Sequence, residues 1–253
     1  SSSVLTMFAF GLSGCFRTSS DDSGTTYSGV AIDGPLSTAK VFIDANNNGL
    51  LDSSEKWTLT SSDGSFSLTT EDTGNLAVVT TSDTIDTSSG AIVSGLTLAA
   101  PSGSTVISPA TTVVEAILDS YRTANPTASE ADLATAQTNA YADTAEALGL
   151  SNDVDLTSYN PFSSDVDATS ADAIAYATKS AQIVAVANTI AEAEAAAGGG
   201  DKDVILGNAL SEIASQIASS AAADSVVEIN GAFVDTVIAS AAPTMNANAT
   251  LKA

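Results

Sequence analysis

Residues 44–55 read DANNNGLLDSSE, an acidic and asparagine-rich stretch with a glycine near its centre. The spacing matches the calcium-loop pattern D-x-[DN]-x-[DN]-G-x5-E at every specified position. Ca²⁺ takes about six to eight oxygen ligands, and a loop of this kind supplies them from one short turn. The sequence therefore predicts a calcium site whose ligands are the side chains of Asp44, Asn46, Asn48, Asp52 and Glu55 and the backbone carbonyl of Leu50.

The residues on either side of this loop indicate β-structure. Residues 40–44, KVFID, are apolar and β-branched before the loop, and residues 57–60, WTLT, alternate after it. A sensor that opens a hydrophobic groove needs two helices at this place. We therefore expect an EF-hand-like calcium hairpin that rigidifies a β-domain. A plain polar turn is the alternative, because Asn, Asp and Gly are common turn residues.

The composition restricts the classes of partner and chemistry. Thirty acidic residues against seven basic ones give the 253-residue chain a net charge of −23, which disfavours nucleic acid and anionic membranes as partners. The absence of histidine removes the usual general base and most transition-metal sites. A single cysteine cannot form an intrachain disulfide. These features favour a non-enzymatic protein secreted into a salty environment.

An apolar segment precedes the β-region. Residues 4–12 form an apolar run of signal-peptide length, too short to span a bilayer. The four residues that end it, LSGC at 12–15, resemble the bacterial lipobox, which implies lipid attachment at Cys15 and a polar tether over residues 16–28. Membrane association would then occur only through this lipid anchor. The alternative is that Val4–Phe10 is an ordinary strand and Cys15 a buried thiol.

Residues 27–107 are predicted to form a β-sandwich of about seven strands, because short alternating segments recur between turn signals. Within it, Trp57 and Leu59 are expected to pair with Phe66 and Leu68 across an Asp63-Gly64 turn. Residues 76–81, 91–100 and 105–107 are the later strands.

Three segments of this region resemble the prealbumin-like sandwiches of bacterial surface proteins, such as carboxypeptidase-regulatory-like, Cna-B-like and SdrD-B-like modules. They are residues 34–43, GPLSTAKVFI, the calcium loop, and residues 60–68, TSSDGSFSL. The resemblance covers about a third of the chain and implies a structural or adhesive module outside the cell. Residues 74–78, GNLAV, stand where these families have a closing G-x-Y-x-V step.

Residues 108–241 are predicted to form an antiparallel bundle of about five helices, because the apolar period changes from two to 3.6 at Ser108. Ser108 and Pro109 are expected to start the first helix, and Thr127 with Glu130 the second. Gly149 and Gly198 are expected to end the second and third helices. The fourth starts at Asp201 and the fifth at Asp224, which leaves residues 242–253 as a tail.

The predicted function is that of a calcium-stabilised structural or adhesive protein at the bacterial cell surface, with a surface receptor or glycan as partner. The alternative is a self-assembling subunit of an extracellular filament or matrix. Either the apolar residues of 4–10 or the alternating tail at 245–251 would then complete a neighbour's sheet. Acidic pairs at 153/155 and 165/167 could bind further calcium, although exposed acids usually only solvate a loop. An enzyme is the weakest class.

Overall fold

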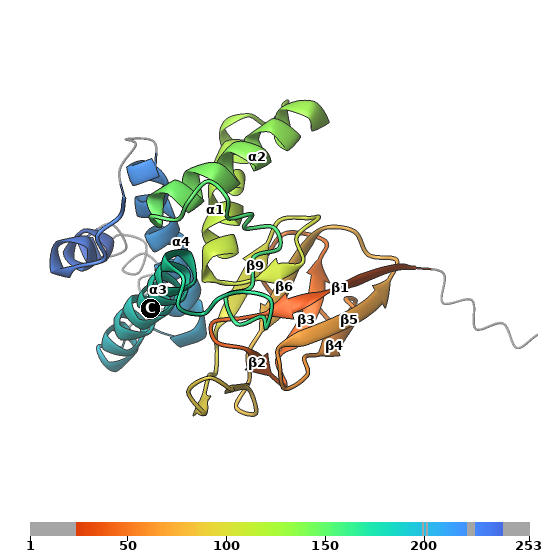
Figure 1. The fold of residues 1–253 in the computed structure, drawn as a ribbon, viewed down its shortest axis with the longest axis horizontal. Coiled ribbons are helices and arrows are strands. Elements are labelled where there is room, and N and C mark those ends of the chain that lie inside the picture. The colour runs from red at the N-terminus through yellow and green to blue at the C-terminus, as the bar shows by residue number, and fades with distance from the viewer. Residues whose placement is uncertain (1–23, 199, 201, 222–225, 240–253) are drawn as a thin grey trace, which may run out of the picture.

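The computed structural model describes residues 24–198, 200, 202–221 and 226–239. The protein is a mixed α+β fold in which the strands occupy the N-terminal part of the chain and the helices follow. Figure 1 shows the strands gathered on one side of the molecule and the helices on the other. The fold class expected from the change of apolar period is confirmed at this level.

Among the described residues there are ten strands in three sheets. The first sheet has the order β10 (Val106–Ile107), β1 (Thr25–Ala31), β5 (Ser65–Thr70). The second has the order β2 (Leu36–Ser37), β7 (Ile85–Asp86), β8 (Ala91–Ile92). The third has the order β4 (Trp57–Leu59), β3 (Lys40–Asp44), β6 (Asn75–Val79), β9 (Thr97–Ala100). The number of strands exceeds the expected seven because several have only two residues, too few to show alternation in a sequence.

The predicted hairpin between Trp57–Leu59 and Phe66–Leu68 is wrong. Strand β4 pairs with β3, and β5 pairs with β1, so the chain changes sheets between them. Burial gives the reason: Phe66 and Leu68 are buried in the core, whereas Trp57 and Leu59 are about half exposed. The tight turn exists, with the Gly64 amide donating to the Ser61 carbonyl at 3.0 Å, but it redirects the chain.

Two later strands also differ from expectation. The segment 91–100 is divided into β8 and β9 by a turn at Gly95, whose φ is +75°. Strand β10 runs parallel to β1, with Val30 opposite Val106. Parallel neighbours come from distant parts of a chain, so local sequence signals do not reveal them.

The helices are α1 (Pro109–Ala124), α2 (Glu130–Ala147), α3 (Ala171–Ala196) and α4 (Lys202–Ala221), followed by a helical segment at 231–239. As predicted, Ser108 caps α1 with Pro109 at its first position. Ser170 caps α3, whose C-cap, Ala197, precedes Gly198 in the left-handed region. Helix α4 packs against α1, α2 and α3.

Two predicted helix starts are wrong. Helix α2 is capped by Ser129, which exchanges hydrogen bonds with Asp132, rather than by Thr127 and Glu130. The last helical segment begins at residue 231, although the sequence indicated a start at Asp224. The side chain of Asn230 accepts a hydrogen bond from the amide of Phe233 at 3.2 Å, so a later residue provides the cap. Asp224 and Asp201 lie outside the described residues.

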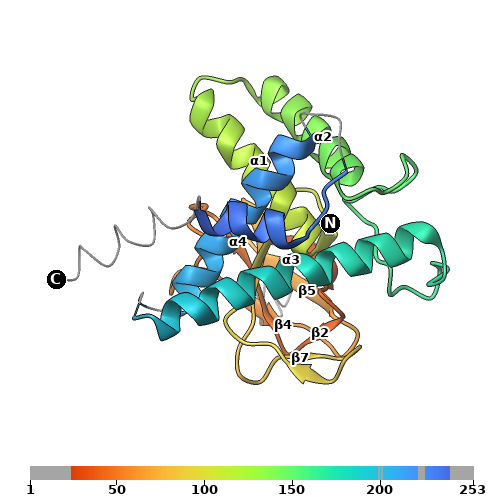
Figure 2. The same cartoon turned by 90° about the vertical axis from the view of Figure 1, so that its left-hand side faces the viewer.

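One hydrophobic cluster runs through both the strands and the helices. It contains strand residues such as Val78 and Leu98 together with helix residues such as Val114 and Ile213. The boundary expected between 107 and 108 coincides with the change from β10 to α1, and α1 packs on β9 directly beyond it. In Figure 2 the helices α1, α2 and α4 lie above the labelled strands. The division of the chain into a sandwich over 27–107 and a bundle over 108–241 stays a prediction.

Candidate metal centre

The 44–55 loop connects β3 to β4 and is organised around the buried carboxylate of Asp44. One oxygen of Asp44 accepts a hydrogen bond from the amide of Asn48 at 3.1 Å, and the other accepts from the amide of Gly49 at 2.7 Å. Gly49 has a φ of +72°, which a glycine adopts without strain. The first expected ligand therefore also folds the loop back on itself.

The other expected side chains lie close to one another. The side-chain amides of Asn46 and Asn48 both donate through Nδ2 to Oδ2 of Asp52, at 2.8 and 3.1 Å. The carboxylate of Glu55 is buried and closes the loop, because it accepts from the backbone amides of Ala45 at 3.0 Å and Asp52 at 2.9 Å. Leu50 contributes its amide to the Asn48 side chain at 2.8 Å, and its own side chain is exposed.

The donor chemistry of this loop suits calcium, because hard carboxylate and amide oxygens are the ligands that Ca²⁺ prefers. Among residues 24–198, 200, 202–221 and 226–239, however, no three acidic, histidine or cysteine side chains are grouped as a metal cluster. Calcium would therefore need the amide oxygens of Asn46 and Asn48 as well as the carboxylates. Asp52 would have to exchange its two asparagine hydrogen bonds for the ion.

Five side chains outside the expected ligand set link the loop to helix α1. Oδ1 of Asn47 accepts from Asn75 at 2.7 Å, and Nδ2 of Asn47 donates to Asp119 at 2.7 Å. Asn75 also donates to Oε1 of Glu115 at 2.6 Å. Arg122 closes the circuit by donating to Glu115 at 2.5 Å and to Asp119 at 2.7 Å. We call these five residues the Asn47 ring.

Glu115 carries an unusual buried carboxylate within this ring. It is only 4% exposed, and its Oε2 has no hydrogen-bond partner among the described residues. Burial raises the pKa of Glu115 to about 7, although the hydrogen bond and charge of Arg122 oppose that rise. The carboxyl is therefore held near the point where it gains or loses a proton around neutral pH.

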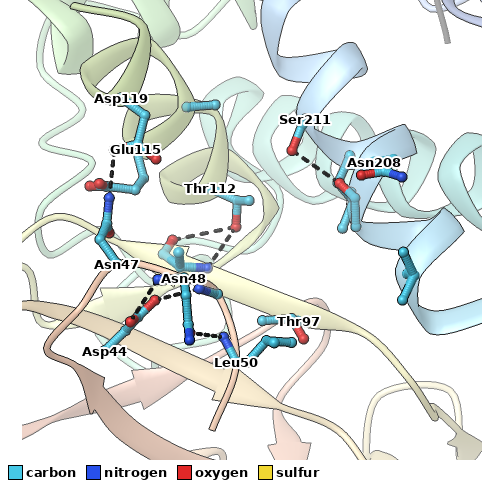
Figure 3. Close-up of a pocket in the computed structure, with 16 residues that line it drawn as sticks. Asp44, Asn47, Asn48, Leu50, Thr97, Thr112, Glu115, Asp119, Asn208 and Ser211 are labelled. Carbon is cyan, nitrogen blue, oxygen red and sulfur yellow. Dashed lines mark hydrogen bonds between the residues drawn. The ribbon is translucent and has the colours of Figure 1, made fainter. Parts of the chain in front are cut away.

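A hollow of about 420 Å³ adjoins the loop and the ring. Figure 3 shows Glu115 and Asp119 of α1 on one side of it and Asn208 and Ser211 of α4 on the other. The loop residue Asn48 lies at its base, toward the strands. Of the described residues, those that line the hollow have acidic, amide, hydroxyl and apolar side chains, and none is a lysine or arginine.

The remaining predicted site residues lie elsewhere. Asp153, Asp155 and Asp165 line a separate surface hollow beside β1 and β10. Asp155 accepts hydrogen bonds from the amide and hydroxyl of Thr157, at 3.0 and 2.7 Å, so it stabilises its own turn. Asp167 does the same with Thr169. Cys15, the expected lipidation site, lies outside the described residues.

The Asn47 ring was not predicted from the sequence. Glu115 and Arg122 lie two helical turns apart beside the apolar residues Val114 and Leu118. Two charged residues at that spacing, next to an apolar stripe, could have indicated a polar contact at the edge of the buried helix face. Nothing in the sequence indicated that Asn75 would lie between this helix and the loop.

Comparison with protein-family models, with curated proteins and with solved structures found no match to this chain. Within the described part of the chain, none of the helices combines the length and hydrophobicity that a bilayer span requires. The arrangement of the loop and its surroundings is therefore the basis for any functional proposal.

Proposed function

We propose that this protein is a calcium-stabilised, non-enzymatic structural or adhesive protein of the bacterial cell surface. The observation that carries the proposal is the 44–55 loop, in which Asp44 and Glu55 are buried at the two ends and the side chains of Asn46 and Asn48 both donate to Asp52. Calcium would exchange hydrogen bonds between these side chains for ion contacts and so fix the connection between β3 and β4.

Several features support the extracellular location and the non-enzymatic character in this proposal. Extracellular calcium modules bind with Kd values of about 0.1–1 mM, which suits a loop with only three carboxylates. A net charge of −23 and the absence of histidine favour a soluble, non-catalytic protein. The finer architecture that we propose is a prealbumin-like sandwich over 27–107 with an antiparallel bundle over 108–241. Lipid on Cys15 would hold it at the surface, where a receptor or glycan would be its partner.

Calcium titration combined with thermal unfolding tests the proposal. A ligand that binds only the folded state stabilises it, by about 2.7 kcal/mol at a hundred times its Kd. Calcium should therefore raise the melting temperature of the wild type, and Glu55→Gln or Asp44→Ala should abolish most of that rise. Mg²⁺ should substitute poorly, because it holds its water ligands and demands octahedral geometry.

A matched control is Asp143→Ala, which removes an exposed acid from helix α2, away from every candidate calcium site, and should leave the calcium-dependent rise intact. The comparison uses the calcium-dependent increment, because Asp44 also holds two loop amides without any metal. A wild-type melting temperature that is the same in calcium and in chelator would rule out the calcium function.

We propose a second candidate, a filament subunit that assembles by strand addition. Strand β4 is an edge strand that pairs only with β3 among the described strands, and its Trp57 and Leu59 are 45% and 49% exposed. An edge with free backbone groups and exposed apolar side chains is a place where a strand of another copy can pair. The donor would be the apolar segment at residues 4–10.

A further inference from the structure

The Asn47 ring joins three separate parts of the chain through one closed circuit of hydrogen bonds. Asn47 belongs to the loop, Asn75 begins β6, and Glu115, Asp119 and Arg122 project from α1. All five bonds in the circuit are between 2.5 and 2.7 Å. Because each member touches two others, no side chain can move without breaking contacts on both sides.

The ring holds the loop at Asn47, the loop's non-glycine residue with a positive φ. Asn47 has a φ of +57°, a left-handed conformation that L-residues rarely adopt and that Asn tolerates better than most. It lies between Asn46 and Asn48, two of the expected calcium ligands. A change in the backbone at Asn47 would therefore turn both ligand side chains away from their present positions.

The ring also lies next to the first expected ligand. Asn75 is opposite Asp44 in the β3–β6 pair, so the residue that bridges loop and helix is the strand neighbour of Asp44. Gly74 lies so close to this pair that a Cβ there would be 2.5 Å from the Asp44 carbonyl oxygen. Asp44 and Asn75 therefore have little room to shift relative to each other.

We propose that the Asn47 ring couples helix α1 to the calcium site. The position of α1 then sets the calcium affinity of the loop, and bound calcium stabilises α1. The inference rests on the proposed calcium function. Residues that orient ligands from outside the coordination sphere commonly change metal affinity about 10- to 100-fold when they are mutated. Coupling between two sites is reciprocal, so the effect on α1 follows from the effect on the ion.

Two variants break the ring from opposite ends. Asn47→Gly removes the side chain from the loop, and glycine accepts the positive φ without strain. Arg122→Met acts from the helix and leaves the loop sequence unchanged. The second variant separates the ring from simple charge effects: loss of a cation near the loop would by itself tighten calcium binding, whereas loss of the ring weakens it.

Isothermal titration with calcium chloride measures the outcome on the full chain. We expect both variants to bind calcium at least about tenfold more weakly than wild type. The matched control is Asn208→Ala, which removes an asparagine from the opposite wall of the same hollow and should leave the Kd unchanged. Tighter binding by Arg122→Met, or a Kd within twofold of wild type for either variant, would overturn the role of the ring while leaving calcium binding in place.

Hydrogen exchange provides an independent measurement on the helix. Calcium should slow amide exchange over residues 114–122 of the wild type, and this added protection should be lost in Asn47→Gly even at saturating calcium. Equal protection in the two proteins would contradict the coupling. If the wild type itself binds no calcium, both the proposed calcium function and the coupling are wrong. If the wild type binds calcium and the variants bind it with the same affinity, only the coupling is wrong.

Discussion

Glu115 places a carboxylate where water cannot solvate it. Its Oε1 accepts from Asn75 and Arg122, but its Oε2 has no partner among the described residues. A buried charge that is only partly compensated costs free energy of folding. Asp33 is in a related position, because burial and the neighbouring carboxylate of Asp86 raise the pKa of Asp33 to about 7. Both acids disfavour the folded state when they are ionised.

The stability of the protein should therefore fall as pH rises from about 4.5 to about 7. The pKa of Glu115 rises from 4.5 to about 7 on folding, so the folded state binds more protons than the unfolded state in that window. Urea unfolding in chelator at pH 5 and pH 8 should show a loss on the order of 3 kcal/mol from this residue.

Glu115→Gln should remove its share of this pH dependence, because glutamine does not ionise. Gln still leaves a polar atom at the unpartnered position, so the slope against pH is the quantity to compare rather than the absolute stability. Asp33→Asn should remove a further part of the pH dependence, and the double variant should show the smallest change in free energy of unfolding with pH. A slope in Glu115→Gln as steep as in wild type would contradict the raised pKa.

At the scale of single elements, the start of α1 does more than begin a helix. Ser108 is fully buried, and its hydroxyl accepts from the amide of Thr111 at 3.1 Å and from the hydroxyl of Tyr176 at 2.7 Å. Tyr176 lies on α3 and is itself buried, so the cap of one helix satisfies the polar group of another. The two helices are thereby fixed to each other at one point.

Ser108→Ala should destabilise the protein by about 2–4 kcal/mol. The loss of an N-cap costs about 1 kcal/mol, and the buried hydroxyl of Tyr176 would lose its partner at a further cost of about 1–3 kcal/mol. Ser129→Ala is the matched control, since Ser129 caps α2 at an exposed position and should cost only about 1 kcal/mol. Equal losses in the two variants, measured by urea unfolding, would show that the contact between Ser108 and Tyr176 contributes nothing.

The elements also show what can be read from a sequence. The start of α1 was predictable, because the cap Ser108 acts through a hydrogen bond to a residue three positions away, and so was the end of α3 at Gly198, where the backbone turns left-handed. The spacing of the loop residues was equally local. The partners of β4 and β5 were not predictable, since burial of Phe66 against distant strands outweighed the local turn. The Asn47 ring likewise exists only once α1 has packed beside β6.

At the scale of the whole molecule, a net charge of −23 opposes contact between copies. Assembly through β4 would therefore require calcium or high salt to screen the charge. Lys40 lies over the Trp57 ring, with Nζ 4.7 Å from the ring centre. It is the one basic residue in strands β3 and β4, so it places a positive charge beside this edge. Such a lysine limits indiscriminate pairing at an edge.

If the filament candidate is correct, electron microscopy of the protein with calcium should show ordered fibres. Trp57→Lys should prevent them by adding charge at the edge, as should deletion of residues 1–14, which removes the proposed donor. Ile92→Lys, at an exposed apolar residue of β8, should still form fibres. Ordered fibres from Trp57→Lys, or dispersed wild-type particles under all of these conditions, would exclude this mode of assembly.

The parallel pair of β1 and β10 has a consequence for synthesis of the protein. Val30 can meet Val106 only after the ribosome has added the roughly 75 residues between them, which takes on the order of 4–15 s at about 5–20 residues per second. During that interval the backbone groups of β1 that later face β10 have no permanent partner. The nascent chain therefore presents an open strand edge for several seconds, and this is the period in which a chaperone would protect it from pairing wrongly.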